Sequence, residues 1–239
     1  MPSRKKPQEF GTNTAWPEMQ LAGNPFVYRR QRHVRTESPG VQRRYQDFKP
    51  FLRREFRRKC IYCRISDGIR GAEAFGVEHY RPKARFPEDE LNYANLFYAC
   101  NPCNQRKGDF WPDAVLEAAD VFIPNPCDHG MGDHVECRGA EILAHSMAGT
   151  FLIARLRLDS VVLINLRGFI LRQLARVLNA EQDILKTIAD LSPRIANLGG
   201  EEQRQAQQEL ALLQARLQEC RQDLYLLTGE DGSEEGAPP

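Results

Sequence analysis

The sequence predicts an α+β chain in which a small strand–strand–helix unit, held by a four-cysteine zinc site, is embedded in a mostly α-helical chain. Two observations predict this class. Two Cys-x-x-Cys pairs, Cys60–Cys63 and Cys100–Cys103, enclose short strand-like segments, and the last third of the chain repeats apolar residues at helical spacing. The 239 residues are 41% hydrophobic and 27% charged, as in a soluble globular protein, and no apolar stretch is long enough to span a membrane.

The first quarter of the chain is strongly basic. Residues 1–60 carry 15 Lys and Arg against 5 Asp and Glu, whereas residues 201–239 carry 3 against 9. Because basic segments neutralise phosphates and release their counterions, this quarter is a candidate nucleic-acid contact surface. A solvated basic surface without a partner is the alternative. Prolines and glycines make residues 1–40 a partly irregular basic arm.

Residues 41–115 contain the strand–strand–helix unit. A helix is expected over residues 41–59, where Phe48, Phe51, Leu52 and Phe56 recur at helical spacing. Short strands are expected over residues 74–80 and 95–99, separated by a charged loop that contains proline. A short helix is expected to begin near Pro102, because proline suits a first helical turn.

The remainder of the chain is expected to be loop-rich first and helical afterwards. Residues 116–150 form a loop-rich connection, residues 151–228 a helical region, and residues 229–239 a disordered acidic tail. Within the helical region, Ser192-Pro193 and Gly199-Gly200 separate two heptad patterns, which is typical of a helical hairpin or coiled coil. The hairpin could pack within the chain, mediate a homodimer or bind a partner.

The two cysteine pairs predict one structural zinc ion. Four thiolates form a closed tetrahedral site that leaves no position for a reactive water. Seven cysteines are an odd number, which favours a reducing, cytoplasmic setting over a disulfide framework. Two unrelated reduced pairs, or a redox pair, are the alternatives.

The segment between and around the cysteines resembles the HNH endonuclease family. It reads Val77-Glu78-His79-Tyr80-Arg81-Pro82-Lys83, then Asn95-Leu96, then Cys100-Asn101-Pro102-Cys103-Asn104-Gln105-Arg106-Lys107. The family pattern is an acid–His pair on a strand, a middle Asn-Leu and a final Cys-Asn-x-x-His or Lys. The resemblance covers about 50 residues and implies a ββα-metal finger with endonuclease activity.

The resemblance also implies a role for each matched residue. His79 matches the general base, and Asn95 the middle Asn that ties down the loop and orients that base. Glu78 and Asn104 match the ligands of one Mg²⁺ or Mn²⁺ ion, although the acid is more often Asp. Lys107 stands where the second histidine of the pattern would be, and could hold a phosphate as a point charge. A salt-bridged histidine at a strand edge is the structural alternative for Glu78-His79.

Two further sets of residues remain as weaker candidates. Arg81, Lys83 and Arg106 could contact nucleic-acid phosphates, or could simply be solvated. A second metal could bind at a Cys-His cluster whose spacing matches no standard site; its members are Cys127, His129, His134 and Cys137.

A looser resemblance concerns the context in which the chain acts. Glu78-His79-Tyr80-Arg81-Pro82-Lys83 is similar to the Glu-His-Phe-Arg-Pro-Lys signature of bacterial HNH nucleases that accompany ATPases in anti-phage systems, including Septu and some retron systems. It implies a defence nuclease that acts on DNA, with RNA not excluded, and that has an ATPase partner. The alternative is a catalytically silent, zinc-stapled nucleic-acid-binding or assembly subunit that acts through its helical hairpin.

Overall fold

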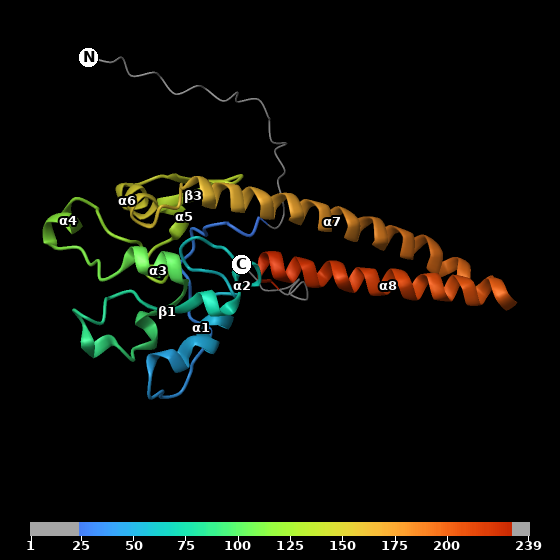
Figure 1. The fold of residues 1–239 in the computed structure, drawn as a ribbon, viewed down its shortest axis with the longest axis horizontal. Helices are drawn as coiled ribbons and strands as arrows, with labels where there is room; N and C mark the ends of the chain where they lie inside the picture. Colours follow the sequence, from blue (N-terminus) through green and yellow to red (C-terminus); the bar gives the residue numbers. More distant parts are fainter. Residues whose placement is uncertain (1–23, 231–239) are drawn as a thin grey trace, which may run out of the picture.

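The computed structural model describes residues 24–230, and Figure 1 shows a head from which a long pair of antiparallel helices projects. We call residues 24–158 the head and the pair α7 (Val161–Ile195) and α8 (Gly200–Thr228) the hairpin. Most of the irregular arm and of the acidic tail predicted from the sequence lies outside the described residues. No helix in the described part of the chain is long and apolar enough to cross a membrane.

The chain enters the head through a 3₁₀ turn, η1 (Tyr45–Phe48), and helix α1 (Lys49–Glu55). Pro50 lies in the first turn of α1, as its fixed φ angle favours. Phe48, Leu52 and Phe56 are buried, as the helical spacing predicts. The regular helix is shorter than expected because Arg57 and Arg58 adopt left-handed backbone angles that end it before the first cysteine.

The strand–strand–helix order that the sequence predicts is confirmed. Strands β1 (Phe75–His79) and β2 (Leu96–Cys100) pair in antiparallel register, with Phe75 opposite Cys100 and His79 opposite Leu96. Helix α3 (Asn101–Lys107) follows at once, with Pro102 in its first turn. Short helical turns precede β1 and fill the loop between the strands, namely α2 (Asp67–Arg70), η2 (Ala72–Ala74), η3 (Pro87–Asp89) and η4 (Tyr93–Asn95).

The segment predicted as mostly loop contains more regular structure than expected. It holds α4 (Ala114–Ala118), α5 (Met131–His134) and a two-stranded hairpin of β3 (Val135–Arg138) and β4 (Glu141–Ala144). Each strand has only four residues, so an alternating pattern is too short to stand out in the sequence. Val135 and Ile142 become buried in the core, and this tertiary burial favours the strands.

The predicted helical region is a helix pair preceded by a shorter helix. Arg157 has a left-handed φ of 52° and divides the expected helix into α6 (Met147–Leu156) and α7. Pro193 lies inside the last turn of α7 and does not end it, whereas the turn before α8 falls at Gly199-Gly200 as expected. The hairpin is confirmed; sustained coiled-coil packing stays a prediction.

The far end of α8 returns to the head and packs against it. A Cβ atom added at Gly68 of α2 would lie 2.5 Å from the backbone oxygen of Leu226, so only glycine permits this close approach. The guanidinium of Arg58 lies 4.1 Å from the ring centroid of Tyr225. Lys59, buried just before the first cysteine, bonds Glu230 at 2.6 Å. These contacts fix the base of the hairpin beside the cysteine-rich part of the head.

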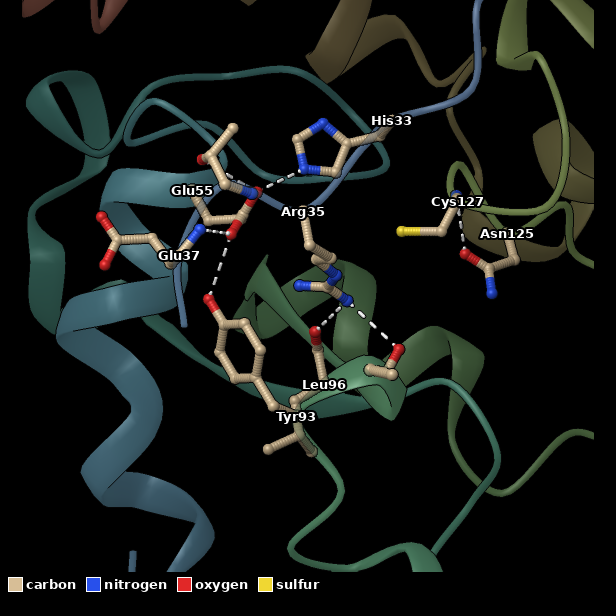
Figure 2. Close-up of polar contacts among 10 residues, drawn as sticks. His33, Arg35, Glu37, Glu55, Tyr93, Leu96, Asn125 and Cys127 are labelled. Atoms are coloured by element: carbon tan, nitrogen blue, oxygen red, sulfur yellow. Dashed lines mark hydrogen bonds and ion pairs between the residues drawn. The ribbon is translucent and has the colours of Figure 1, made fainter. Parts of the chain in front are cut away.

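The segment at residues 33–37, which we call the strap, is bound by the buried carboxylate of Glu55 (Figure 2). One carboxylate oxygen accepts from the backbone N–H of Thr36 at 2.9 Å and lies 2.7 Å from Nε2 of His33. The other accepts from the backbone N–H of Glu37 at 2.8 Å and from the Tyr93 hydroxyl at 3.3 Å. A buried carboxylate with this many donors holds the strap against α1.

The side chain of Arg35 extends from the strap and packs among three aromatic rings. Its guanidinium lies 4.6 to 5.1 Å from three ring centroids, those of Phe56, Tyr93 and Phe97. The same group donates to the carbonyls of Ala94 at 3.2 Å and Leu96 at 2.7 Å (Figure 2). These carbonyls flank Asn95, so the strap fixes the backbone where the loop between the strands returns to β2.

The strap should make the protein sensitive to acid. Burial lowers the pKa of His33 below its ordinary value of 6.5. Burial alone would raise the pKa of Glu55, but the N–H groups of Thr36 and Glu37, together with His33, hold it below 4.5. Both groups bind protons more readily when unfolded, so the free energy of unfolding should fall as pH drops below 6.5 and again below 4.5. Thermal unfolding from pH 7 to pH 4 measures this.

A matched pair of variants isolates the contribution of Glu55. Glu55→Gln should lower the free energy of unfolding at pH 7 by about 2–3 kcal/mol, because hydrogen bonds to a charged group are lost. It should also weaken the dependence of that free energy on pH between pH 7 and pH 4. Glu219→Gln, on the exposed face of α8, should leave both unchanged. Equal pH dependence in the two variants would show that the strap does not cause the acid sensitivity.

Candidate functional site

The four cysteines meet at one point in the head. Cys60 and Cys63 follow α1, Cys100 ends β2 and Cys103 lies in α3. All four are buried, their sulfur atoms lie within 4.8 Å of one another, and Sγ of Cys63 is 3.8 Å from Sγ of Cys100. In a tetrahedral site with Zn–S bonds of about 2.3 Å, the sulfur atoms are about 3.8 Å apart. The donor set therefore fits a closed structural zinc.

The backbone of the first cysteine pair forms the turn that such a site needs. The N–H of Cys60 donates to the carbonyl of Ile65 at 3.0 Å, and the N–H of Arg64 donates back to the carbonyl of Cys60 at 3.0 Å. Arg64 takes a left-handed φ of 61° to close this turn. The N–H of Ile61 donates to Tyr98 on β2 at 2.9 Å, which ties the turn to the sheet.

His79 is the last residue of β1 and is half-buried. Its Nε2 lies 3.1 Å from the backbone oxygen of Glu90, and the Tyr45 ring packs edge-on at 4.7 Å between centroids. A carbonyl can only accept, so Nε2 carries the proton and Nδ1 keeps its lone pair. Burial lowers the pKa of His79 below 6.5, against the opposing effect of the Glu90 bond, so the ring is neutral at pH 7.

Asn95 brackets the loop that supports His79. Its Oδ1 accepts from the backbone N–H of Arg81 at 2.7 Å, and its Nδ2 donates to the carbonyls of Arg81 at 3.0 Å and Asp89 at 3.3 Å. One buried amide thus joins both ends of the segment from residue 81 to residue 89. Glu90, whose carbonyl receives His79, follows directly, so this amide fixes the loop position from which His79 is oriented.

Glu78 and Lys107 occupy a different environment from the one expected for a metal ligand and a phosphate contact. Both are 1% exposed, and Nζ of Lys107 lies 2.6 Å from Oε1 of Glu78. Lys107 also donates to the backbone oxygen of His79 at 2.8 Å. The second carboxylate oxygen, Oε2, accepts from the Tyr62 hydroxyl at 2.9 Å. The Lys107 ammonium therefore points into the protein and is not exposed for a phosphate contact.

The expected ligand set for a divalent cation does not fit this arrangement. Both oxygens of Glu78 are engaged, one by Lys107 and one by Tyr62, whereas a Mg²⁺ ligand needs an oxygen that is free to coordinate the ion. Asn104 is half-buried, and its Nδ2 lies 3.5 Å from the backbone oxygen of Val77. Its Oδ1 accepts no hydrogen bond within the described part of the chain. Of the two expected ligands, Glu78 and Asn104, only Asn104 therefore keeps an oxygen free to bind a cation.

The three basic candidates have different surroundings. Arg81 pairs with Asp89, and its guanidinium lies 4.0 Å from the ring centroid of Phe86. Arg106 turns toward α6 and donates to the backbone oxygen of Leu156 at 2.9 Å. Lys83 stays on the surface, 3.4 Å from Glu90 and 4.4 Å from the centroid of the Tyr45 ring. Of the three, Lys83 alone lies on the aromatic ring that also packs on His79.

The second Cys-His cluster is not brought together as a metal site. His129 and His134 face each other at 5.4 Å between ring centroids, but Nδ1 of His134 lies 2.7 Å from the Ser146 hydroxyl. Cys137 donates to the carbonyl of Gly139. Within residues 24–230, the four-cysteine group is the one set of three or more His, Cys, Asp or Glu side chains close enough to hold a metal ion.

Much of the basic charge before the first cysteine is paired within the protein. Arg53 and Arg58 bind the two oxygens of the buried Asp67 at 2.6 and 2.9 Å. Arg54 binds Glu37 of the strap at 2.8 Å. A phosphate surface built from this quarter, as the sequence predicts, therefore has fewer available cations than the composition indicates.

The structure adds two site residues that sequence reasoning missed. Tyr62 lies between the first two cysteines and contacts Glu78, while Tyr45 packs on His79 from η1. The position of Tyr62 between Cys60 and Cys63 is a sequence signal that it lies near the site, because a turn held by a metal fixes the directions of its side chains. Tyr45 lies 34 residues before His79, and no local pattern indicates their contact.

The fold and the site together define a class: a ββα unit stapled by four cysteines, with a neutral histidine at the end of its first strand. Residues 60–110 match the model of the HNH endonuclease family, which confirms the resemblance over that segment. None of the curated proteins and none of the solved structures matches the chain.

Proposed function

We propose that the chain is a metal-dependent HNH endonuclease that hydrolyses phosphodiester bonds of DNA, with His79 as general base. The single observation that supports this most strongly is the orientation of His79 inside the matched segment. Its Nε2 is bound to the Glu90 carbonyl, so Nδ1 of a neutral ring is left to accept a proton.

The reaction begins with the transfer of a proton from a water molecule to Nδ1 of His79. The oxygen of that water attacks phosphorus while the bond from phosphorus to the 3′ oxygen of the deoxyribose breaks, and this leaving oxygen takes up a proton from the solvent. The free Oδ1 of Asn104 would help to hold a divalent cation, which would supply stabilisation of the charge on the phosphate and on the leaving oxygen. Asn95 keeps the supporting loop in place, and Lys83 beside Tyr45 lies where it can contact the phosphate backbone.

A plasmid-cleavage assay tests this function. Purified protein is incubated with supercoiled plasmid and Mg²⁺ or Mn²⁺, with parallel reactions in EDTA and with single-stranded RNA as substrate. We expect nicked or linear plasmid with the cation and none in EDTA. Uncut plasmid under every condition, with the native partner also present, would contradict the proposal, and preferential RNA cleavage would move the substrate class to RNA.

We also propose that this nuclease serves in anti-phage defence together with an ATPase. The support is the signature from Glu78 to Lys83, and the hairpin offers a long projecting surface for such a partner (Figure 1). Co-purification with an ATPase encoded beside it, lost when residues 180–215 at the hairpin tip are replaced by a short loop, would support this role. Undiminished binding after that deletion would place the contact elsewhere.

A further inference from the structure

The two positions at which the chain carries the less usual residue of the HNH pattern contact each other. Glu78 stands where aspartate is more usual, Lys107 where the second histidine would be, and their charged groups lie 2.6 Å apart. We propose that Glu78 and Lys107 form one unit, a buried ion pair that positions His79, and that Glu78 is not a ligand of the catalytic cation. The catalytic part of this inference depends on the proposed function; the structural part does not.

Each charged atom of the pair is matched by partners inside the protein. Lys107 binds Oε1 of Glu78 and the backbone oxygen of His79, while Tyr62 binds Oε2 of Glu78. Burying a charge is costly unless it is paired and hydrogen-bonded, and both conditions are met here.

These contacts connect the three parts of the finger. Tyr62 belongs to the first cysteine turn, Glu78 to β1 and Lys107 to the last turn of α3. The Lys107 ammonium reaches the carbonyl of His79 itself, so it fixes the backbone that carries the histidine. The pair therefore links the cysteine turn to the backbone of His79, so the position of the proposed base depends on that of the zinc site.

The backbone around Lys107 is hydrogen-bonded to α6, which restrains its side chain beside Glu78. The backbone oxygen of Lys107 accepts from Arg155 of α6 at 3.0 Å, and the neighbouring Arg106 donates to Leu156 at 2.9 Å. The end of α3 is therefore fastened to α6. A divalent cation bound to Glu78 would have to displace the buried Lys107 ammonium or lie in contact with it. Two positive charges in contact inside a protein repel each other strongly.

The side-chain lengths support the same conclusion. Aspartate at position 78 would be one methylene shorter and would draw the carboxylate back from Lys107 and from Tyr62. The long Glu and the long Lys together bridge the gap between β1 and α3. Two departures that look independent in the sequence are thus a single structural change.

A double-mutant cycle on unfolding tests the pair without any need for activity. Glu78→Gln and Lys107→Met, made singly in the full chain with zinc, should each lower the unfolding temperature by roughly 6–20 °C, because each leaves a buried charge unpaired. The double variant should recover more than half of that loss. Additive losses would overturn the pair.

A surface pair of the same residue types provides the matched control. Lys83 and Glu90 lie 3.4 Å apart with side chains 46% and 44% exposed. The cycle of Lys83→Met and Glu90→Gln should show almost no coupling, because exposed ion pairs contribute little. If the surface pair shows coupling as large as that of Glu78 and Lys107, the coupling does not arise from burial, and the unfolding data no longer support a buried ion pair.

The dependence of cleavage on cation concentration tests the second half of the inference. In the Glu78→Gln/Lys107→Met variant, the Mg²⁺ concentration for half-maximal plasmid cleavage should equal that of the wild type, even where the rate falls. A rise of about tenfold or more in both variants that contain Glu78→Gln, but not in Lys107→Met, would make Glu78 a ligand. If the wild type does not cut at all, the proposed function fails, and the unfolding cycle still decides the pair.

Discussion

Replacing Cys103 by serine should abolish cooperative folding of the head and release the zinc. The four thiolates are buried, and no other cluster in the described residues can replace them. Binding of a structural zinc contributes about 10–16 kcal/mol in zinc-finger peptides, which is as large as the whole stability of a typical domain. Atomic absorption should find one zinc per wild-type chain and almost none in Cys103→Ser, and thermal unfolding should lose its sharp transition.

Cys220→Ser is the matched control, because this cysteine lies on α8, away from the zinc cluster, and is only half-buried. It should keep one zinc and the wild-type unfolding curve. Well-folded wild-type protein without zinc, or Cys103→Ser with full zinc and normal unfolding, would contradict the structural role of the site.

The zinc matters so much because the finger is small. Residues 60–110 contain two five-residue strands and one seven-residue helix. Units of this size rarely bury enough apolar surface to fold without a metal or other covalent restraint. The ion would join the turn after α1, the end of β2 and helix α3, which pack around β1 and His79.

The parts of the fold that the sequence predicts well are those encoded by local patterns. Cys-x-x-Cys spacing identifies the zinc ligands, Pro102 marks the first turn of α3, and Gly199-Gly200 marks the turn between the long helices. Each of these signals lies within a few residues of its effect. The order of strands and helix follows from them with little reference to tertiary structure.

The Glu78–Lys107 pair could not be predicted in this way. The resemblance gives each residue a role from its place in the motif, but whether the ammonium of Lys107 points outward or inward depends on how α3 packs against β1 and α6. The two residues are 29 positions apart, and each alone could bind a metal or a phosphate. Only the fold shows that they satisfy each other.

Which basic side chains remain available for a phosphate contact could not be predicted from charge composition, for a similar reason. The excess of Lys and Arg before Cys60 predicts a phosphate surface, yet Arg53 and Arg58 point toward Asp67, which lies beyond the first cysteine pair. A count of charges along a sequence contains no information on such long-range pairing. Which cations stay at the surface is therefore set by the fold. Lys83 is one of them: it pairs with the exposed Glu90 at 3.4 Å and lies on the Tyr45 ring that also packs on His79.

Replacing His79 by alanine should lower the rate of plasmid cleavage by about 10²–10⁴-fold, the usual contribution of a general base. The residue is half-buried at the end of β1, and its removal takes away one hydrogen bond to Glu90 and one ring contact with Tyr45. The zinc content should stay at one per chain and the unfolding temperature should change little, because neither the cysteines nor the Glu78–Lys107 pair is disturbed. Cleavage rates at saturating Mg²⁺, measured beside zinc content, test this.

His145→Ala is the control for this prediction. His145 is a surface histidine directly after β4 of the other small sheet. It lies 3.3 Å from Glu136, and its loss should leave cleavage at the wild-type rate. If His79→Ala and His145→Ala cut plasmid equally fast, another group supplies the base, or a contaminating nuclease does the cutting. If His79→Ala loses both cleavage and zinc, its effect is structural and the assignment of Nδ1 as the proton acceptor fails. Loss of cleavage with zinc and stability intact is the result that the bond from Nε2 to Glu90 leads us to expect.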